Sequence, residues 1–74
     1  MPKGIPNKKR QGLFYILLQE EQDPEGGTRW SINYNRSFRG RVFFQHGTYA
    51  KSKYEAVGVG KKWAERYKCE LYEE

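Results

Sequence analysis

The residues GTYAKSKYEAVGVGKKW, Gly47–Trp63, contain the start of the one helix that the sequence predicts. Ser52 precedes Glu55 by three positions, the spacing of a capping box, in which each side chain accepts a backbone N–H at the helix start. Beyond Ser52, apolar or small residues recur at spacings of three and four, which predicts one apolar stripe on a helix that runs to about Cys69. The stripe consists of Ala56, Val57, Gly60, Trp63, Ala64, Tyr67 and Leu71.

Two glycines lie inside this predicted helix, where each costs about 1 kcal/mol relative to alanine. Gly60 lies within the apolar stripe, so its missing side chain would let the helix approach a packed aromatic residue of a sheet. The candidates for that contact are Trp30, Tyr34 and Phe44. Gly58 lies off the stripe and has no such explanation. We therefore expect this helix to pack on a sheet rather than to bind a partner.

Three segments before the helix have the composition of β-strands. Leu13–Gln19 is rich in aliphatic and aromatic residues, Arg29–Asn35 alternates between apolar and polar residues, and Arg41–Gly47 follows a turn that ends in glycine. Short connections between them predict an antiparallel meander. We therefore expect a single α+β domain over residues 13–74, a three-stranded antiparallel sheet packed on one C-terminal helix.

Alternation within the second and third strands assigns their side chains to two faces of the sheet. The face expected to pack on the helix is apolar and consists of Trp30, Ile32, Tyr34, Val42 and Phe44. The opposite, open face is mainly polar and consists of Arg29, Ser31, Asn33, Asn35, Arg41, Phe43 and Gln45.

Charge is unevenly distributed along the 74 residues, whose net charge is +5. Residues 1–12 hold four cations, two prolines and two glycines, and we expect them to form a disordered basic tail. Residues 11–28 contain four acids and no cation, whereas residues 29–54 contain six cations and no acid. A basic run of this length suggests a polyanionic partner, with nucleic acid as the leading candidate.

Enzyme and metal chemistry have little support in the sequence. His46 is the only histidine and Cys69 the only cysteine, so neither a zinc ligand set nor a recognisable Cys–His motif is present. The segment GVGKK lacks the spacing and the hydroxyl residue of a phosphate-binding loop. We therefore expect no catalysis, no metal, no cofactor and no small-molecule substrate.

Cysteine content and hydropathy bear on the compartment. One cysteine allows no intramolecular disulfide, which favours a reducing, intracellular location. The longest apolar run, Leu13–Leu18, has six residues, far fewer than the roughly 18 of a membrane span. No signal-peptide pattern follows the basic N-terminus. We expect a cytoplasmic protein without a membrane partner, associated with a nucleoid or acting in a host cell.

The open face has the side chains that recognise bases. Arginine pairs with guanine, and asparagine or glutamine pairs with adenine, in the major groove. Phe43, outward among cations, suits stacking on a base or contact with a thymine methyl group. Lys51 and Lys53 flank the helix start, where backbone N–H groups also favour phosphate. Lys8, Lys9 and Arg10 would add a flexible arm.

Three strands followed by GTYAKSKYEA, Gly47–Ala56, resemble a known arrangement. The pattern resembles the three-stranded, one-helix DNA-binding domains at the N-termini of tyrosine integrases and is similar to plant ethylene-response-type domains. The resemblance covers about Leu13 to Lys68 and implies that the sheet enters the major groove. By this resemblance the base-contacting residues are Arg29, Ser31, Asn33, Arg39, Arg41 and Phe43. The integrase catalytic domain is absent, so we expect either part of a longer protein or a small phage or mobile-element protein.

Other partners fit part of the pattern. Double-stranded RNA-binding domains share the KSKxEA helix start, but their first helix would have to precede Leu13, where the tail cannot supply it. Small bacterial domains without an assigned role share the strand and helix layout. A protein-binding module, such as a phage inhibitor of a host protein, would use the exposed aromatics Tyr15, Phe38, Phe43 and Tyr49. RNA or single strands would be bound through stacked aromatics.

The sequence therefore predicts a non-catalytic domain that binds double-stranded DNA through the open face of its sheet. The residues expected to contact DNA are Arg29, Ser31, Asn33, Arg39, Arg41, Phe43, Gln45, Lys51 and Lys53, with Lys8, Lys9 and Arg10 from the tail.

Overall fold

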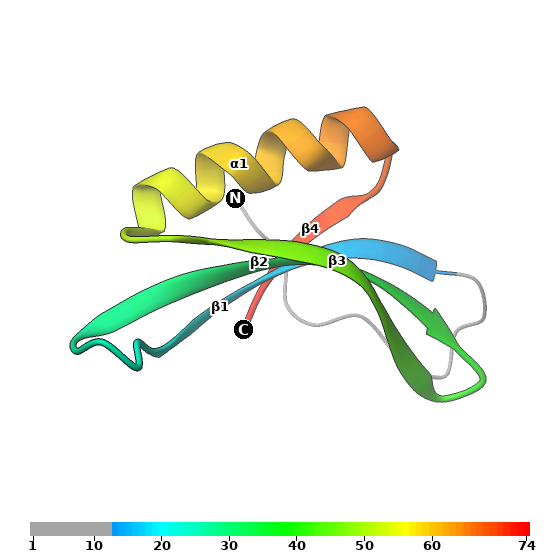
Figure 1. The fold of residues 1–74 in the computed structure, drawn as a ribbon. Coiled ribbons are helices and arrows are strands. Elements are labelled where there is room, and N and C mark those ends of the chain that lie inside the picture. Colours follow the sequence, from blue (N-terminus) through cyan, green and yellow to red (C-terminus); the bar gives the residue numbers. More distant parts are fainter. Residues whose placement is uncertain (1–12) are drawn as a thin grey trace.

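The structure, a computed structural model, describes residues 13–74, and the predicted tail with Lys8, Lys9 and Arg10 lies outside the described residues. The described chain forms a four-stranded sheet with one helix lying across one of its faces (Figure 1). Along the sheet the strands follow the order β3-β2-β1-β4. The elements are β1 (Leu13–Gln22), β2 (Thr28–Phe38), β3 (Arg41–Ala50), α1 (Lys53–Tyr67) and β4 (Glu70–Glu73).

The expected α+β class is confirmed, with three antiparallel strands followed by one helix. The prediction that the sheet has only three strands is wrong, because β4 pairs with β1 in parallel and makes the sheet mixed. Leu71, which continued the helical spacing in the sequence, lies in β4 opposite Ile16. Four residues are too few to show a strand period, so their helical spacing with the preceding residues dominated the prediction.

The two ends of α1 have different capping interactions. At the start, Ser52 has an extended backbone and its hydroxyl accepts the Glu55 N–H at 3.2 Å, as the capping motif predicts. At the other end, Lys68 adopts a left-handed conformation with φ of 54°, and its N–H donates to the carbonyl of Ala64. The helix therefore ends at Tyr67, two residues before the predicted end, and the chain turns into β4.

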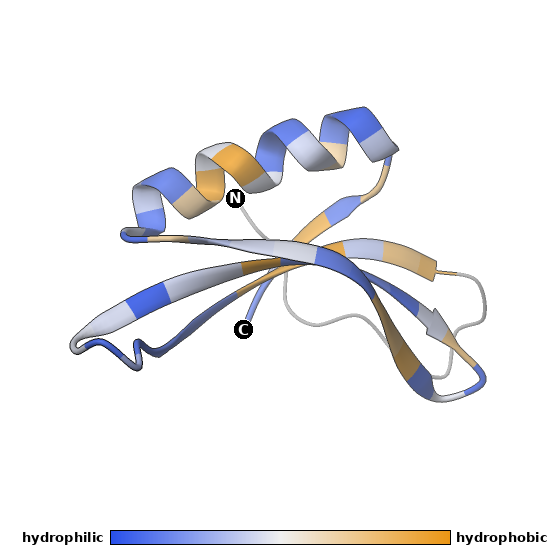
Figure 2. Ribbon diagram, in the orientation of Figure 1, coloured by the Kyte–Doolittle hydropathy of each residue, from blue (hydrophilic) through white to orange (hydrophobic). Residues whose placement is uncertain are grey.

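The core lies between the helix and the sheet. Figure 2 shows a further apolar segment outside this layer, in the part of β3 next to its turn with β2. The buried core residues are Ile16, Leu18, Trp30, Ile32, Ala50 and Ala56. Around them, the partly buried residues are Tyr34, Val57, Val59, Trp63, Ala64, Tyr67, Cys69 and Leu71.

The predicted close approach at Gly60 is confirmed, but its partners are aliphatic. A Cβ added at Gly60 would lie 2.9 Å from Cδ1 of Leu71 and 3.2 Å from Cδ2 of Leu18. The predicted aromatic partners are wrong because the unforeseen β4 supplies Leu71 and β1, the strand beside it, supplies Leu18. A Cβ added at Gly58 would meet nothing within 4 Å, so no close contact requires glycine there.

Replacing these two glycines by alanine should have different effects on stability. Gly58→Ala should raise the free energy of unfolding by about 1 kcal/mol, because alanine favours the helix and nothing obstructs its methyl group. Gly60→Ala should gain clearly less, since its methyl group must displace Leu18 or Leu71. Urea unfolding of both variants measures the difference, and equal stabilisation would contradict the close packing at Gly60.

Candidate nucleic-acid interface

A β-bulge divides β3 into two halves with opposite alternation. Tyr34 pairs with His46, whereas the next residue, Asn35, pairs with Phe44, which leaves Gln45 as an extra residue. Residues directly opposite each other share a face of the sheet. Phe44 therefore lies on the face away from the helix, and Phe43 lies on the helix side.

The predicted faces of the first half of β3 are therefore wrong. Val42 pairs with Ser37 and lies with Phe44 on the face away from the helix, although both were expected in the core. Arg41 pairs with Phe38 and lies on the helix side with Phe43, although both were expected on the open face. One inserted residue reverses every side chain beyond it, and a period-two pattern does not reveal the insertion.

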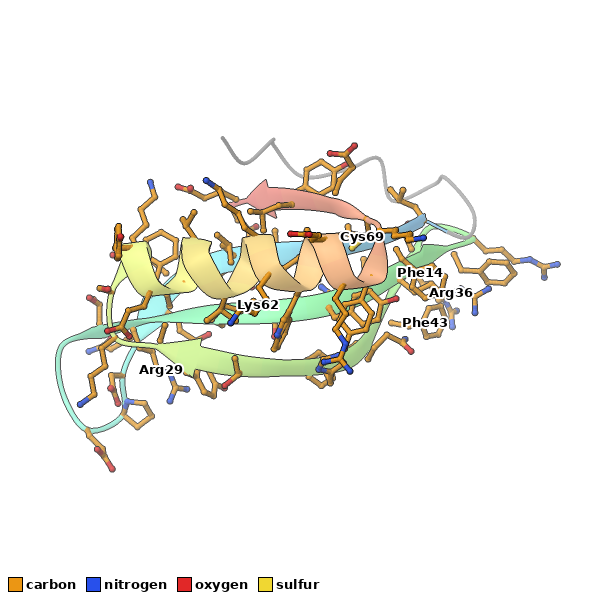
Figure 3. The ribbon with its side chains drawn as sticks, turned by 90° about the horizontal axis from the view of Figure 1, so that it is seen from above. Phe14, Arg29, Arg36, Phe43, Lys62 and Cys69 are labelled. Carbon is orange, nitrogen blue, oxygen red and sulfur yellow. The ribbon has the colours of Figure 1, made fainter. Side chains whose placement is uncertain are left out.

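The residues predicted to contact DNA consequently lie in separate places. Arg29, Ser31 and Asn33 lie on the face away from the helix, and Gln45 lies at the bulge. Arg39 and Arg41 lie at the β2–β3 turn, while Lys51 and Lys53 lie at the end of β3 and the start of α1. Figure 3 shows Arg29 near one end of the sheet and Phe14, Arg36 and Phe43 together near the other.

Polar groups on the face away from the helix are largely engaged within the protein. Ser31 is only 3% exposed, and its hydroxyl donates to the carbonyl of Gln19 at 3.3 Å. The side-chain amide of Asn33 in turn donates to the Ser31 hydroxyl at 3.2 Å. Tyr15 and Leu17 on this face are also buried. Little of this face is therefore free to recognise bases, contrary to the expectation of an open polar face.

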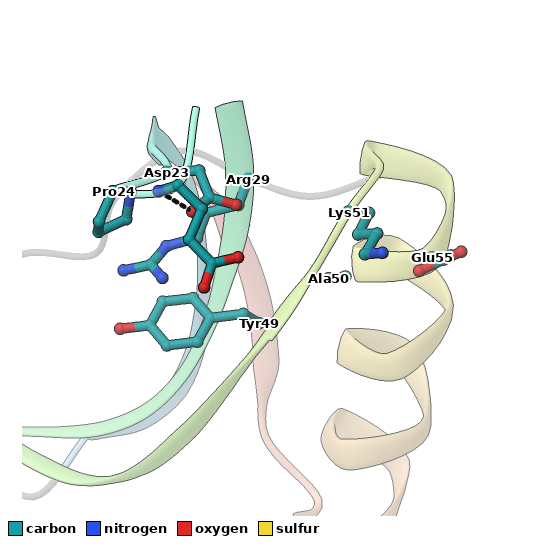
Figure 4. A pocket seen from close by; sticks show the side chains of 8 residues that line it. Asp23, Pro24, Arg29, Tyr49, Ala50, Lys51 and Glu55 are labelled. Atoms are coloured by element: carbon teal, nitrogen blue, oxygen red, sulfur yellow. Dashed lines mark hydrogen bonds between the residues drawn. The ribbon is translucent and has the colours of Figure 1, made fainter. Parts of the chain in front are cut away.

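Arg29 is held by two neighbours beside an open hollow. Its Nε donates to Glu21 at 2.8 Å, and its guanidinium lies 3.7 Å from the centre of the Tyr49 ring (Figure 4). The hollow has a volume of about 550 Å³. Three of its lining residues are acidic and two, Arg29 and Lys51, are basic, and Arg29 is already paired with Glu21. The residues that line it are Asp23, Pro24, Glu25, Arg29, Tyr49, Ala50, Lys51 and Glu55.

The β2–β3 turn forms a different kind of surface, here called the basic hairpin end and defined as Arg36, Phe38, Arg39, Arg41 and Phe43. The turn consists of Arg39 and Gly40, whose φ angles of 51° and 77° are both positive, as in a type I′ turn. The guanidinium of Arg36 lies 4.8 Å from the centre of the Phe38 ring, and that of Arg39 lies 5.2 Å from it. Phe43 is 44% exposed. This end therefore combines three cations with accessible aromatic surface.

Charges separate along the length of the sheet. The β1–β2 loop, which carries Asp23 and Glu25 next to Glu20 and Glu21, lies at the end of the sheet opposite the β2–β3 turn (Figure 1). Lys68, just after α1, lines a second hollow with Phe14 and Glu70, near the β2–β3 turn. Acids therefore outnumber cations at the loop end, where Arg29, Lys51 and Lys53 also lie, and cations outnumber acids at the hairpin end.

Aromatic side chains form a packed row behind the basic hairpin end. The rings of Tyr34 and Tyr67 stack with centres 4.3 Å apart, and Phe14 stacks on Tyr34 at 5.7 Å. His46 lies against Trp63 at 4.9 Å and is 2.9 Å from the Tyr67 hydroxyl, from Nε2 to oxygen. The sequence shows these residues only as isolated aromatics, because strand and helix residues meet here through tertiary packing. The row joins the last turns of α1 to the hairpin.

Within residues 13–74, no three histidine, cysteine or acidic residues lie together as a metal site would require. No helix in this part of the chain is long and apolar enough to cross a membrane.

Comparison with known proteins provides no relative, since no protein-family model, curated protein or solved structure matches the chain. The resemblance to integrase N-terminal domains therefore stays a prediction. Function has to be inferred from the residues of this chain.

Gly47 is needed for close contact between β2 and β3 beside the bulge. A Cβ there would lie 2.6 Å from the side-chain oxygen of Asn33 and 2.8 Å from the backbone oxygen of Ile32. Gly47→Ala should therefore lower the free energy of unfolding by about 1–3 kcal/mol, the usual cost of overpacking. Adding Asn33→Ala should restore only part of this, because the backbone contact remains. Urea unfolding tests both variants, and wild-type stability of Gly47→Ala would contradict the close contact.

Alkaline pH should destabilise the domain. Burial raises the pKa of the Cys69 thiol above its ordinary 9.0, and the nearby Glu70 charge adds to this. Burial likewise raises the pKa of Tyr15 and Tyr34 above their ordinary 10.0. The folded state then keeps protons that the unfolded state has lost, so the free energy of unfolding falls as pH rises beyond about 9.

Urea midpoints measured between about pH 7 and pH 11 test this prediction. The Cys69→Ala variant is the control, because it should lack the earliest part of the decline. A midpoint that stays constant or rises over this range would contradict the effect of burial on these groups.

Proposed function

We propose that this chain is a non-catalytic DNA-binding domain that contacts duplex DNA with its basic hairpin end. The observation that carries the proposal is the grouping of Arg36, Arg39 and Arg41 at one projecting hairpin end. The acids of the β1–β2 loop lie at the far end of the sheet, and Glu70 in β4 is the acid on the hairpin half of the sheet. This surface replaces the open sheet face as the proposed site, since the polar groups of that face bond within the protein.

Electrostatics support the hairpin end over a general attraction to polyanions. Residues 13–74 contain ten lysines and arginines and nine acids, so the described domain is nearly neutral. Attraction to DNA must then come from the local grouping of cations. Contacts between arginines and phosphates release counterions and make affinity depend steeply on salt.

The aromatic residues beside the arginines support contact with the grooves as well as with phosphates. Phe43 and Phe44 project from opposite faces of β3 and are 44% and 64% exposed. Exposed rings of this kind insert between base steps or stack on bases in DNA-binding proteins. Arg36 holds its guanidinium over two phenylalanine rings and its Nε is buried, so a bidentate contact with guanine would use its two terminal nitrogens.

Arg39 provides an independent argument. It occupies a left-handed turn position, which costs a residue with a side chain roughly 1–2 kcal/mol and usually holds asparagine, aspartate or glycine. An arginine at such a position is explained if its side chain contacts a ligand from the tip of the hairpin.

The basic tail joins the domain at the same end. Leu13, the first described residue, pairs with Ser37 next to the turn. We propose that Lys8, Lys9 and Arg10 add phosphate contacts beside the hairpin, as the sequence predicted.

Neutralising the two arginines of the turn region should weaken DNA binding. The pair Arg39→Gln and Arg41→Gln should lower affinity for a 20-base-pair duplex by about tenfold or more and reduce the salt slope by about two. Fluorescence anisotropy at 50 and 200 mM salt measures both quantities. The matched control, Lys61→Gln with Lys62→Gln, removes the same charge from the exposed side of α1.

Equal losses in the two double variants would contradict the hairpin site, because they would indicate general charge attraction. Absence of any wild-type binding at 50 mM salt would contradict DNA binding itself. Competition by a single strand that exceeds competition by duplex would favour the alternative in which Phe44 and its neighbours stack on unpaired bases.

A single substitution at the turn should separate stability from binding. Arg39→Asn puts asparagine before Gly40, the pair preferred in type I′ turns, and should raise the free energy of unfolding by up to about 1 kcal/mol. The same change should weaken duplex binding several-fold. Urea unfolding and anisotropy on one preparation test both effects, and unchanged binding would remove Arg39 from the proposed interface.

A further inference from the structure

β3 is an edge strand whose outer side is open. It has ten residues, and in the order β3-β2-β1-β4 it has a single neighbour within residues 13–74. All of residues 41–49 are exposed, and only Ala50 is buried. Alternate residues of an edge strand direct their N–H and C=O groups away from the sheet. β3 therefore presents a row of alternating donors and acceptors.

The two edges of the sheet differ in how they are protected. Proteins usually guard an edge by keeping it short or by placing charges or proline on it. β4 has only four residues, and Glu70, Glu73 and Glu74 surround it. β3 has no proline and no charge from Val42 to Ala50, apart from a titratable His46. The bulge at Gln45 interrupts it once, but residues 46–50 pair regularly with β2.

The chemistry of this edge selects a peptide over a nucleic acid. Phosphate oxygens accept hydrogen bonds but donate none, so they would satisfy the outward N–H groups and leave the carbonyls unpaired. Another strand supplies both partners in register. The occupant of this edge is therefore an extended polypeptide.

Charge distinguishes a foreign strand from a second copy of this chain. Arg41 lies at one end of β3 and Lys51 just beyond the other. In an antiparallel pair of two β3 strands, Arg41 of each copy would approach Lys51 of the other, and like charges opposite each other destabilise a sheet. Lys51 carries no ion pair among the described residues, although Asp23, Glu25 and Glu55 line the same hollow, whereas Lys53 binds Glu73 at 3.0 Å. Acidic residues near the ends of the bound strand would pair with both cations.

We propose that β3 binds an extended segment of a partner protein that has acidic ends and a short apolar centre, by adding it as a fifth strand. Phe44 and Tyr49, 64% and 57% exposed on the face away from the helix, would cover alternate apolar side chains of that strand. This site runs along the edge of β3 and shares Arg41 and Phe44 with the proposed DNA contact around the turn. The inference does not depend on DNA binding.

The test uses the full chain and the synthetic peptide Glu-Glu-Val-Thr-Val-Thr-Val-Glu-Glu. Titration of 15N-labelled protein, followed by NMR, should give saturable shifts in β3 and slower hydrogen exchange at alternate β3 amides, with β4 unaffected. In a control peptide, N-methyl groups on four successive central residues remove backbone N–H donors from both edges of the strand. This peptide should bind at least tenfold more weakly. A version with lysine in place of all four glutamates tests charge and should also lose at least tenfold.

Protein variants provide a second measurement that does not depend on the peptide backbone. Lys51→Glu should weaken binding of the acidic peptide at least fivefold, while Lys62→Glu, the same charge change on α1, should leave it unchanged. Equal binding of the N-methylated peptide, shifts confined to other elements, or no saturation at 1 mM peptide would overturn the proposal. A stable dimer of the free protein with protected β3 amides would also overturn it, in favour of a second copy as the occupant.

Discussion

The close packing of Gly60 on Leu18 and Leu71 is the contact on which the arrangement of this domain depends. It joins the helix, the strand β1 and the terminal strand β4 at one point. Without a side chain at residue 60, α1 can lie close enough to the sheet for Leu71 to reach it from β4. At this contact the helix layer and the mixed sheet pack most closely.

Unequal lengths of helix and strands then create the surface that we propose for DNA. Fifteen helical residues span about 22 Å, whereas the eleven residues of β2 span about 36 Å. The helix packs over the part of the sheet with Trp30, Ile32 and Ala50, so the β2–β3 turn extends beyond it. Aromatic residues at that end remain exposed beside the arginines, because no second layer covers them.

The bulge at Gln45 determines which side chains β3 exposes on each face of the sheet. The inserted residue reverses the alternation of side chains in the first half of β3. Phe43 therefore lies on the helix side and Phe44 on the opposite face, whereas a strand without the bulge would have the reverse. Gly47 beside it allows β2 and β3 to stay in close contact despite the inserted residue. Consequently β3 exposes aromatic surface on both faces, in addition to an unpaired edge. The proposed nucleic-acid and peptide surfaces therefore overlap on one hairpin, because both use Arg41 and Phe44.

Local sequence determined much of the architecture. Alternation around Ile32 identified β2, the spacing of Ser52 and Glu55 identified the start of α1, and six cations without an acid over residues 29–54 identified a basic region. Each of these features arises from interactions between residues that are only a few positions apart in the sequence. Tertiary structure alone decided that residues 70–73 form a strand, that Gln45 is inserted, and that Ser31 and Asn33 bond within the protein. Each of these depends on a partner strand, and pairing between distant segments leaves no periodic signal in either one.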